Sequence, residues 1–176
     1  MIVVVAGPPC SGKSTIGEAL AAKRQMVHLE MDAVRVRLMP DSPHTRHDRQ
    51  IAYRAMHFMA EVLAERGQDL ILDACYGHEE DRAEVARIAA RLGVPLLAVE
   101  CRVPLQAALE RHRARCEAHP GLDLTEERVE EMVGGYVFSG DAVAVDGARP
   151  VEEGLERIEA ALNALTPPAS SRRSAT

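Results

Sequence analysis

The residues with the clearest chemical potential lie near the start of the chain, in a glycine-rich loop (residues 7–14). Its sequence, Gly-Pro-Pro-Cys-Ser-Gly-Lys-Ser, is the full G-x-x-x-x-G-K-[ST] pattern, placed between an apolar run and a helical pattern. Glycines let the backbone N–H groups face phosphates, the lysine could reach the β- and γ-phosphates, and the last serine could ligate Mg²⁺. We therefore expect a nucleoside triphosphate to contact Gly7, Pro8, Pro9, Cys10, Ser11, Gly12, Lys13, Ser14 and Thr15.

Two aspartates could complete such a site, because each follows a predicted strand and would lie at the same sheet edge as the glycine-rich loop. Asp32 could accept the proton of an acceptor hydroxyl and orient its oxygen for in-line attack, or it could only cap a short helix. Asp73 could hold Mg²⁺ through water, bind substrate hydroxyls, or cap a loop. The sequence favours a function for both carboxylates.

Arginines could supply the positive charge that a transferring phosphoryl group needs. Arg35 stands three residues after Asp32 and would share its helical face, as a substrate contact or as a solvated residue. Arg111 and Arg115 lie one helical turn apart and would also share a face. This pair could stabilise charge on the phosphoryl group, or it could form a basic helix end that the helix dipole favours.

Strands and helices are predicted to alternate along the chain. Apolar runs predict strands at 1–6, 26–30, 70–72, 96–101 and 142–145. Helical spacing predicts helices at 13–24, from an Asp32 cap to Met39, and at 48–66, 78–92, 104–117, 125–138 and 151–165. The alternation predicts an α/β domain over residues 1–165 with a parallel sheet and right-handed crossovers. Residues 166–176, rich in Pro, Ser and Arg, predict a disordered tail.

The long helix at 48–66 is expected to turn one apolar stripe toward the core. Tyr53 and His57 would then lie on the opposite face, where they could contact substrate, as could His44 and His47 in the preceding loop. A solvated position is the alternative for all four residues. The predicted core stripe consists of Ile51, Ala52, Ala55, Met56, Met59, Val62 and Leu63.

Length and composition bound the class of protein. A chain of 176 residues that is 47% hydrophobic can bury one core, and its apolar runs are far shorter than the ~20 residues of a membrane span. The first residues carry no basic leader, so we expect a cytoplasmic protein. The four cysteines lack C-x-x-C spacing, which argues against a disulfide framework or a zinc site. A net charge of -6 disfavours a broad nucleic-acid surface.

In their order, these motifs resemble the P-loop kinase group, small AAA-type ATP-binding kinase domains related to the 5'-hydroxyl polynucleotide kinase domain and to chloramphenicol phosphotransferase. The resemblance covers residues 1–165. It is carried by residues 7–15, the Met-Asp-Ala-Val-Arg of 31–35, the Leu-Ile-Leu-Asp of 70–73, and Arg111 with Arg115. It implies a P-loop NTPase fold, a three-layer α/β/α sandwich with a five-stranded parallel sheet and a small arginine-bearing lid. ATP and Mg²⁺ are the cofactors that it implies.

The resemblance also implies roles for single residues. Asp32 would be the general base and Arg35 would contact a substrate phosphate. Arg111 and Arg115 would belong to the lid, together with the loop at 117–124. The segment 147–150 would pass the adenine with backbone contacts.

The function favoured by these features is an ATP-dependent phosphotransferase that acts on a hydroxyl of a small molecule. Lysine is absent after Lys23, which argues against the Asn-Lys-x-Asp motif of signalling GTPases. A 5'-hydroxyl polynucleotide kinase stays open, although polynucleotide kinases often have Asp-x-Asn where this chain has Asp-Ala-Cys at 73–75, and serine where it has Glu30. An ATP-binding switch without an acceptor also stays open.

Overall fold

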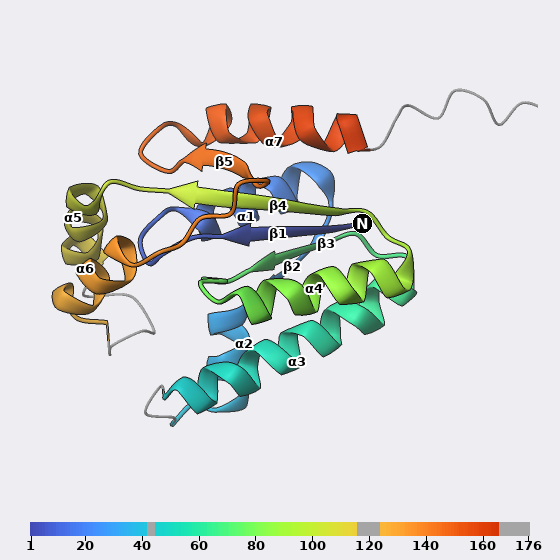
Figure 1. The fold of residues 1–176 in the computed structure, drawn as a ribbon, viewed down its shortest axis with the longest axis horizontal. Helices are drawn as coiled ribbons and strands as arrows, with labels where there is room; N and C mark the ends of the chain where they lie inside the picture. The colour runs from blue at the N-terminus through green and yellow to red at the C-terminus, as the bar shows by residue number, and fades with distance from the viewer. Residues whose placement is uncertain (42–44, 116–123, 166–176) are drawn as a thin grey trace, which may run out of the picture.

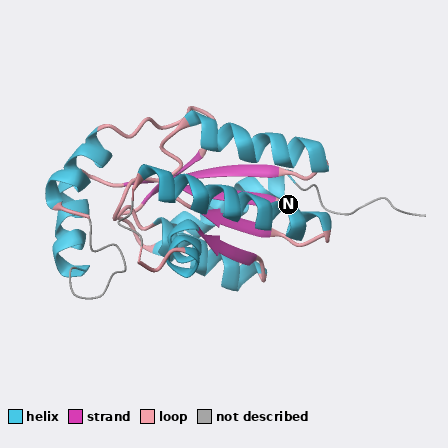
Figure 2. Ribbon diagram, turned by 90° about the horizontal axis from the view of Figure 1, so that it is seen from below, coloured by secondary structure: helices cyan, strands magenta, loops and turns pink. Residues whose placement is uncertain are grey.

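The computed structural model describes residues 1–41, 45–115 and 124–165, which form a parallel sheet with helices on both faces (Figures 1 and 2). All neighbouring strands run parallel, in the order β2-β3-β1-β4-β5. The predicted five-stranded parallel sheet is therefore confirmed. The strands are β1 (Ile2–Ala6), β2 (Val27–Glu30), β3 (Leu70–Asp73), β4 (Leu96–Arg102) and β5 (Val143–Asp146).

The helices form the two outer layers and a group at one end of the sheet (Figure 1). One face is covered by α1 (Lys13–Arg24) and α7 (Val151–Leu165), and the other by α3 (Arg46–Glu65) and α4 (Glu79–Leu92). The short α2 (Met31–Leu38) packs against α3. Beyond the carboxyl ends of the strands, α5 (Leu105–Arg115) packs against α6 (Glu126–Gly134).

The central strand β1 explains why the chain begins with a continuous apolar run. Val3 and Val5 belong to the core under α1 and α7, whereas Ile2, Val4 and Ala6 belong to the core under α3 and α4. A strand that is buried on both faces has no polar alternation, as is typical of parallel sheets. Among the described helices, none has the length and apolarity needed to cross a membrane.

The helix α3 differs from its prediction in both its start and its buried face. It begins at Arg46, because Thr45 and Asp48 form a capping box in which each side chain accepts the other's backbone N–H. Tyr53 and His57 are buried, so the expectation that they lie on the opposite, substrate-facing side is wrong. Met59, predicted as core, is 40% exposed. The buried face consists of Ala52, Tyr53, Met56, His57, Ala60 and Ala64.

Two further helix ends differ from the sequence expectations. Glu30, rather than Asp32, occupies the N-cap of α2, because β2 runs directly into this helix, and Asp32 lies inside its first turn. The helix α6 is capped by Thr125, which accepts the Arg128 N–H at 3.2 Å, but it ends at Gly134 instead of 138. Residues 136–139 return toward the sheet, where the Ser139 N–H donates to Glu100 Oε1 of β4 at 2.9 Å. The predictions for His44, most of the loop at 117–124 and the tail at 166–176 fall outside the described residues.

Candidate active site

The glycine-rich loop leaves the centre of the sheet, between β1 and the start of α1 at Lys13. The neighbours of β1 are β3 on one side and β4 on the other, so the loop lies where the strand order reverses. Crevices at this point bind ligands in open α/β sheets. Cys10 and Gly12 have φ angles of 60° and 88°, which give the loop the curled backbone that phosphate binding requires.

Lys13 lies among negative charges from two neighbouring strand ends. Burial alone would lower its pKa, but the carboxylates of Asp73 and Asp32 hold the pKa of Lys13 above its ordinary value. The ammonium group is therefore charged at neutral pH. This arrangement brings together the lysine and both aspartates that the sequence singled out.

Asp73, at the end of β3, is fully buried, and neither of its carboxylate oxygens has a hydrogen-bond partner among the described residues. Its nearest cationic side chain in an ion-pair contact is His28, whose Nε2 lies 3.5 Å from Oδ2 without the alignment of a hydrogen bond. The Asp73 carboxylate raises the pKa of His28. A buried carboxylate that makes no hydrogen bond is costly, even beside a cation, so Asp73 at the strand end next to β1 is a candidate for contact with a ligand.

Ser14 and Glu30 extend this acidic region on the same side of the sheet. Ser14 Oγ donates a hydrogen bond of 3.3 Å to Glu30 Oε1. Burial, together with the charges of Asp73 and Asp32, raises the pKa of Glu30. Glu30 was not predicted as a site residue, and the sequence signal available for it was only its place at a strand end.

Magnesium fits the oxygen donors at this point. The Ser14 hydroxyl and the two Asp73 oxygens, which accept no hydrogen bond, are hard ligands of the kind that Mg²⁺ prefers. The described residues contain no group of three or more His, Cys, Asp or Glu side chains arranged to hold a metal by themselves.

Asp32 and Arg35 form a second pair of charges on α2. Arg35 Nε lies 3.4 Å from Asp32 Oδ1, and the Asp32 side chain is 38% exposed. Arg35 is only 3% exposed, and its Nη1 has no hydrogen-bond partner within the described part of the chain. The alternative of a solvated arginine is therefore wrong. Asp32 does not cap α2, and its partly exposed carboxylate contacts Arg35 on the same helix.

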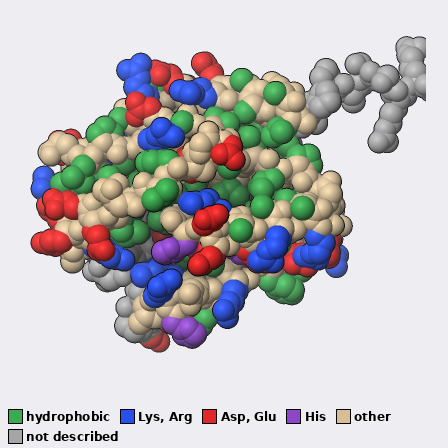
Figure 3. Space-filling view, viewed as in Figure 1, with side chains coloured by type: hydrophobic (Ala, Val, Ile, Leu, Met, Phe, Trp, Pro, Cys, Tyr) green, Lys and Arg blue, Asp and Glu red, His purple; other side chains and the backbone are tan. Residues whose placement is uncertain are grey.

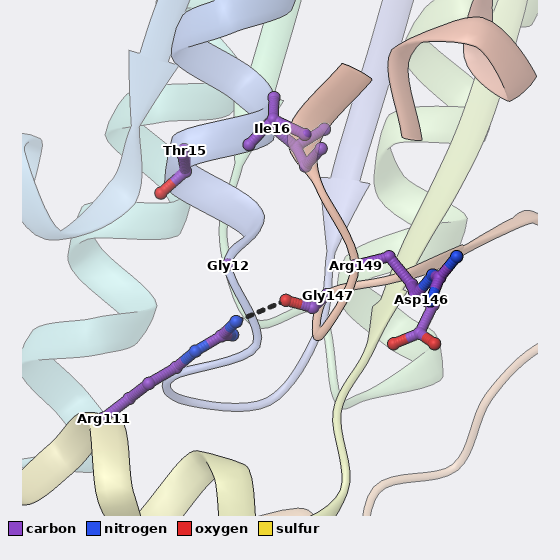
Figure 4. Close-up of a pocket in the computed structure, with 8 residues that line it drawn as sticks. Gly12, Thr15, Ile16, Arg111, Asp146, Gly147 and Arg149 are labelled. Carbon is purple, nitrogen blue, oxygen red and sulfur yellow. Dashed lines mark hydrogen bonds between the residues drawn. The ribbon is translucent and has the colours of Figure 1, made fainter. Parts of the chain in front are cut away.

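Arg111 reaches from α5 to the glycine-rich loop, as Figure 4 shows. Its Nη1 donates a hydrogen bond of 3.1 Å to the carbonyl of Cys10, and its Nη2 donates to the carbonyl of Gly147. The guanidinium thus joins two backbone segments at the nucleotide side. Arg115 is the last residue of α5, and its side chain lies outside the described part of the structure.

A pocket of ≈ 200 Å³ lies beside Arg111, between the start of α1 and the segment that follows β5 (Figure 4). This segment approaches the glycine-rich loop closely, since a Cβ added to Gly147 would lie 1.9 Å from the carbonyl oxygen of Ser11. The pocket includes two of the residues expected near the adenine, Gly147 and Arg149. Its lining also contains residues that the sequence did not indicate: Ile16, Asp146 and Val151.

Comparison with known proteins identifies relatives of the chain. A family model described as an AAA domain matches residues 2–137. An adenylyl-sulfate kinase from Myxococcus xanthus is 32% identical over 114 residues, which is 62% of this chain and 62% of that protein. The chain thus spans less than two thirds of the length of this curated relative.

Two solved structures share the fold along nearly the whole chain. A gluconokinase from Sinorhizobium meliloti superposes with a TM-score of 0.69 at 22% identity, covering 93% of this chain and 91% of that one. An APS kinase from Mycobacterium tuberculosis, solved in complex with AMPPNP and APS, superposes with a TM-score of 0.67 at 23% identity. It covers 90% of this chain and 95% of that one. At these identities the likeness establishes the α/β fold of P-loop kinases.

Proposed function

The chain belongs to the AAA domain family, and from this premise we propose that it is an ATP-dependent kinase that transfers the γ-phosphoryl group to a hydroxyl of a small molecule. The proposal is carried by one observation: the buried Asp73 carboxylate ends the strand beside β1, next to the glycine-rich loop, where its charge and that of Asp32 act on Lys13. Kinases of this class need little more than phosphate binding, charge neutralisation and an oriented hydroxyl.

On the nucleotide side, the backbone N–H groups of the glycine-rich loop and the ammonium of Lys13 bind the phosphates. Ser14 and Asp73 are the residues that would hold Mg²⁺, and the ion would supply positive charge that neutralises the phosphate oxygens. The pocket beside Gly147 and Arg149 receives the adenosine part of ATP. Arg111 closes this side by joining the backbone carbonyls of Cys10 and Gly147.

On the acceptor side, Asp32 accepts the proton of the attacking hydroxyl and orients its oxygen toward the γ-phosphorus. Three observations support this role. Asp32 does not cap its helix, its side chain is partly exposed, and its charge acts on both Lys13 and Glu30. Arg35 holds Asp32 with one nitrogen and keeps Nη1 for an anionic group of the acceptor.

The acceptor is proposed to be a small molecule rather than a nucleic acid. Figure 3 shows acidic and basic side chains interspersed over the face in view, without a broad basic track, and the net charge is -6. The relatives above are named after different small acceptors, an adenylyl sulfate in one case and gluconate in another. This diversity supports a small molecule as the acceptor, and the transfer assay below is designed to identify which one.

A transfer assay with γ-labelled ATP and Mg²⁺ tests this proposal. Label should appear on an acceptor in a fractionated small-molecule extract and not on 5'-hydroxyl oligonucleotides. Lys13→Ala should abolish transfer, because it removes the charge that binds the β- and γ-phosphates. Lys23→Ala is the matched control, since Lys23 is an exposed lysine of the same helix with only a 3.9 Å contact to Glu159.

The other outcomes contradict the proposal in distinguishable ways. Label on the oligonucleotides would identify a polynucleotide kinase. Release of label only as free phosphate would favour a nucleotide-driven switch without an acceptor. Equal activity of Lys13→Ala and Lys23→Ala would exclude the glycine-rich loop as the nucleotide site.

A further inference from the structure

Between α3 and the loop that follows β3, three polar rings form a buried cluster that the proposed reaction does not use. Tyr53 and His57 of α3 meet Tyr76 of the loop, with exposed fractions of 8%, 6% and 0%. Tyr53 and Tyr76 pack edge to face with their centroids 5.4 Å apart, and His57 stacks on Tyr76 at 6.0 Å. We call these three residues the ring cluster.

Tyr76 has a strained backbone that the ring cluster holds in place. Its φ angle is 49°, a left-handed conformation that a tyrosine rarely adopts. Its N–H donates to Tyr53 Oη at 2.9 Å, and its carbonyl accepts from Arg82 Nη1 at 2.6 Å. Its hydroxyl shares a hydrogen bond of 3.1 Å with His57 Nε2. Side chains from α3 and α4 therefore engage all three polar groups of Tyr76.

The residue before Tyr76 connects the same loop to the nucleotide side. The carbonyl of Cys75 accepts the N–H of Gly7, the first residue of the glycine-rich loop, at 3.2 Å. The same carbonyl accepts the hydroxyl of Tyr136 at 2.7 Å, from the segment that returns from α6. A shift in the backbone at Tyr76 would therefore move a hydrogen-bond acceptor away from the glycine-rich loop.

These contacts form a continuous path from α3, which packs on the acceptor-side helix α2, to the nucleotide loop. We propose that Tyr53, His57 and Tyr76 are positioning residues that fix residues 74–77 against the glycine-rich loop and so couple the acceptor side to the nucleotide side. The part that concerns acceptors rests on the proposed function. The part that concerns the glycine-rich loop does not, because it predicts nucleotide affinity and backbone protection directly.

The test uses Tyr53→Phe and Tyr76→Phe in the full chain, which keep the rings and remove one hydroxyl each. The Kd for Mg·ADP should rise about 10-fold, the value of one buried hydrogen bond. Amide hydrogen exchange at Gly7 should become faster by a similar factor. Arg54→Gln, on the exposed face of the same helix, is the control and should change neither quantity.

A pair of substitutions at His57 distinguishes a residue that positions the loop at 74–77 from one that only packs in the core. His57→Gln keeps a hydrogen-bonding group near Tyr76 and should restore most of the Mg·ADP affinity that His57→Leu loses. A fall in Tm with unchanged Kd and unchanged exchange at Gly7 in the tyrosine variants would overturn the proposal, because the ring cluster would then only stabilise the core. If the wild-type chain transferred no phosphoryl group, the proposed function would fail, while exchange at Gly7 would still decide on positioning.

Discussion

At the scale of single residues, the two aspartates of the site differ in environment, and this difference separates their expected roles. Asp73 is fully buried without hydrogen-bond partners in the described chain, whereas the Asp32 side chain is 38% exposed and contacts Arg35. A buried carboxylate at the strand end next to Glu30, the partner of Ser14, suits a fixed ion. A partly exposed one suits an exchanging substrate that must deliver a proton.

Substitution of each aspartate by asparagine tests this assignment. Asp32→Asn should lower kcat by about 10²-fold while Mg·ATP affinity changes by less than about 2-fold, because only the proton acceptor is lost. Asp73→Asn should instead weaken nucleotide binding in the presence of Mg²⁺ and leave binding of Mg²⁺-free nucleotide nearly unchanged. Transfer rates and calorimetric titrations with and without Mg²⁺ measure both effects. A wild-type transfer rate in Asp32→Asn would exclude Asp32 as the proton acceptor.

Gly147 provides a steric test of the nucleotide side. An added Cβ would lie 1.9 Å from the Ser11 carbonyl oxygen, a contact with backbone that cannot rotate away. We expect Gly147→Ala to displace the glycine-rich loop and to raise the Kd for Mg·ADP by about 10-fold or more, at a stability cost of about 1–3 kcal/mol. Gly140→Ala is the control, because its Cβ would meet no atom within 4 Å. Equal nucleotide affinities would contradict the close approach.

At the scale of elements, α3 depends on a capping box rather than on strong helix formers at its start. Thr45 Oγ1 accepts the Asp48 N–H at 3.2 Å, and Asp48 Oδ2 accepts the Thr45 N–H at 2.8 Å. Thr45→Ala should lower the free energy of unfolding by about 1 kcal/mol. Thr125→Ala, which removes the hydroxyl that caps α6, should cost no more, since the residue whose N–H it accepts, Arg128, has no carboxylate to return the bond. Urea unfolding monitored by circular dichroism compares the two; a larger loss for Thr125→Ala would contradict this ranking.

The order of strands and helices could be predicted from sequence because each element carries its own signal. The apolar run of β1 indicates a strand buried on both faces, and the bounds of α1 and α7 agree with the helical spacing at 13–24 and 151–165. The face of α3 could not be predicted, because Tyr53 and His57 count as polar in a local pattern. Their partner Tyr76 becomes visible only when the loop after β3 packs against the helix.

The candidate site also has one part that could be predicted from the sequence and one part that could not. The glycine-rich loop and the two aspartates follow from local patterns combined with the geometry of parallel strands, whose carboxyl ends share one edge. The contacts of Arg111 with Cys10 and Gly147, and of Ser14 with Glu30, join segments that are distant in sequence. Spacing within one helix or loop carries no signal for such pairs, so the structure was needed to find them.

At the scale of the whole molecule, the glycine-rich loop is held by segments that follow strands on both sides of β1 in the sheet. Arg111 contacts it from α5, Gly147 approaches it from the end of β5, and the Cys75 carbonyl binds Gly7 from the end of β3. The nucleotide site therefore depends on the packing of the complete domain. Conditions that loosen the packing around these segments should affect nucleotide affinity before the fold is lost.

One such condition is acid, and His57 gives it a defined sign. Burial lowers the pKa of His57 to about 4, compared with 6.5 for an ordinary histidine, and the rings packed against it, Tyr53 and Tyr76, have raised pKa values and stay neutral. Between pH 6.5 and 4 the unfolded chain binds a proton at this histidine and the folded chain does not, so the free energy of unfolding falls as the pH falls. The difference between the pKa values of His57 in the folded and the unfolded chain corresponds to about 3 kcal/mol in the free energy of unfolding.

This contribution can be isolated by urea unfolding of the wild type and of His57→Gln between pH 7.5 and pH 4. Carboxylates titrate in the same range in both proteins, so only the difference between the two curves reports on His57. We expect the wild type to lose up to about 3 kcal/mol more than the variant as the pH falls, with most of the difference appearing below pH 6.5. His28 must act in the opposite direction, because Asp73 raises its pKa and its contribution is lost as the pH rises. Parallel curves for the wild type and His57→Gln would mean that His57 takes up its proton as readily in the folded chain as in the unfolded one.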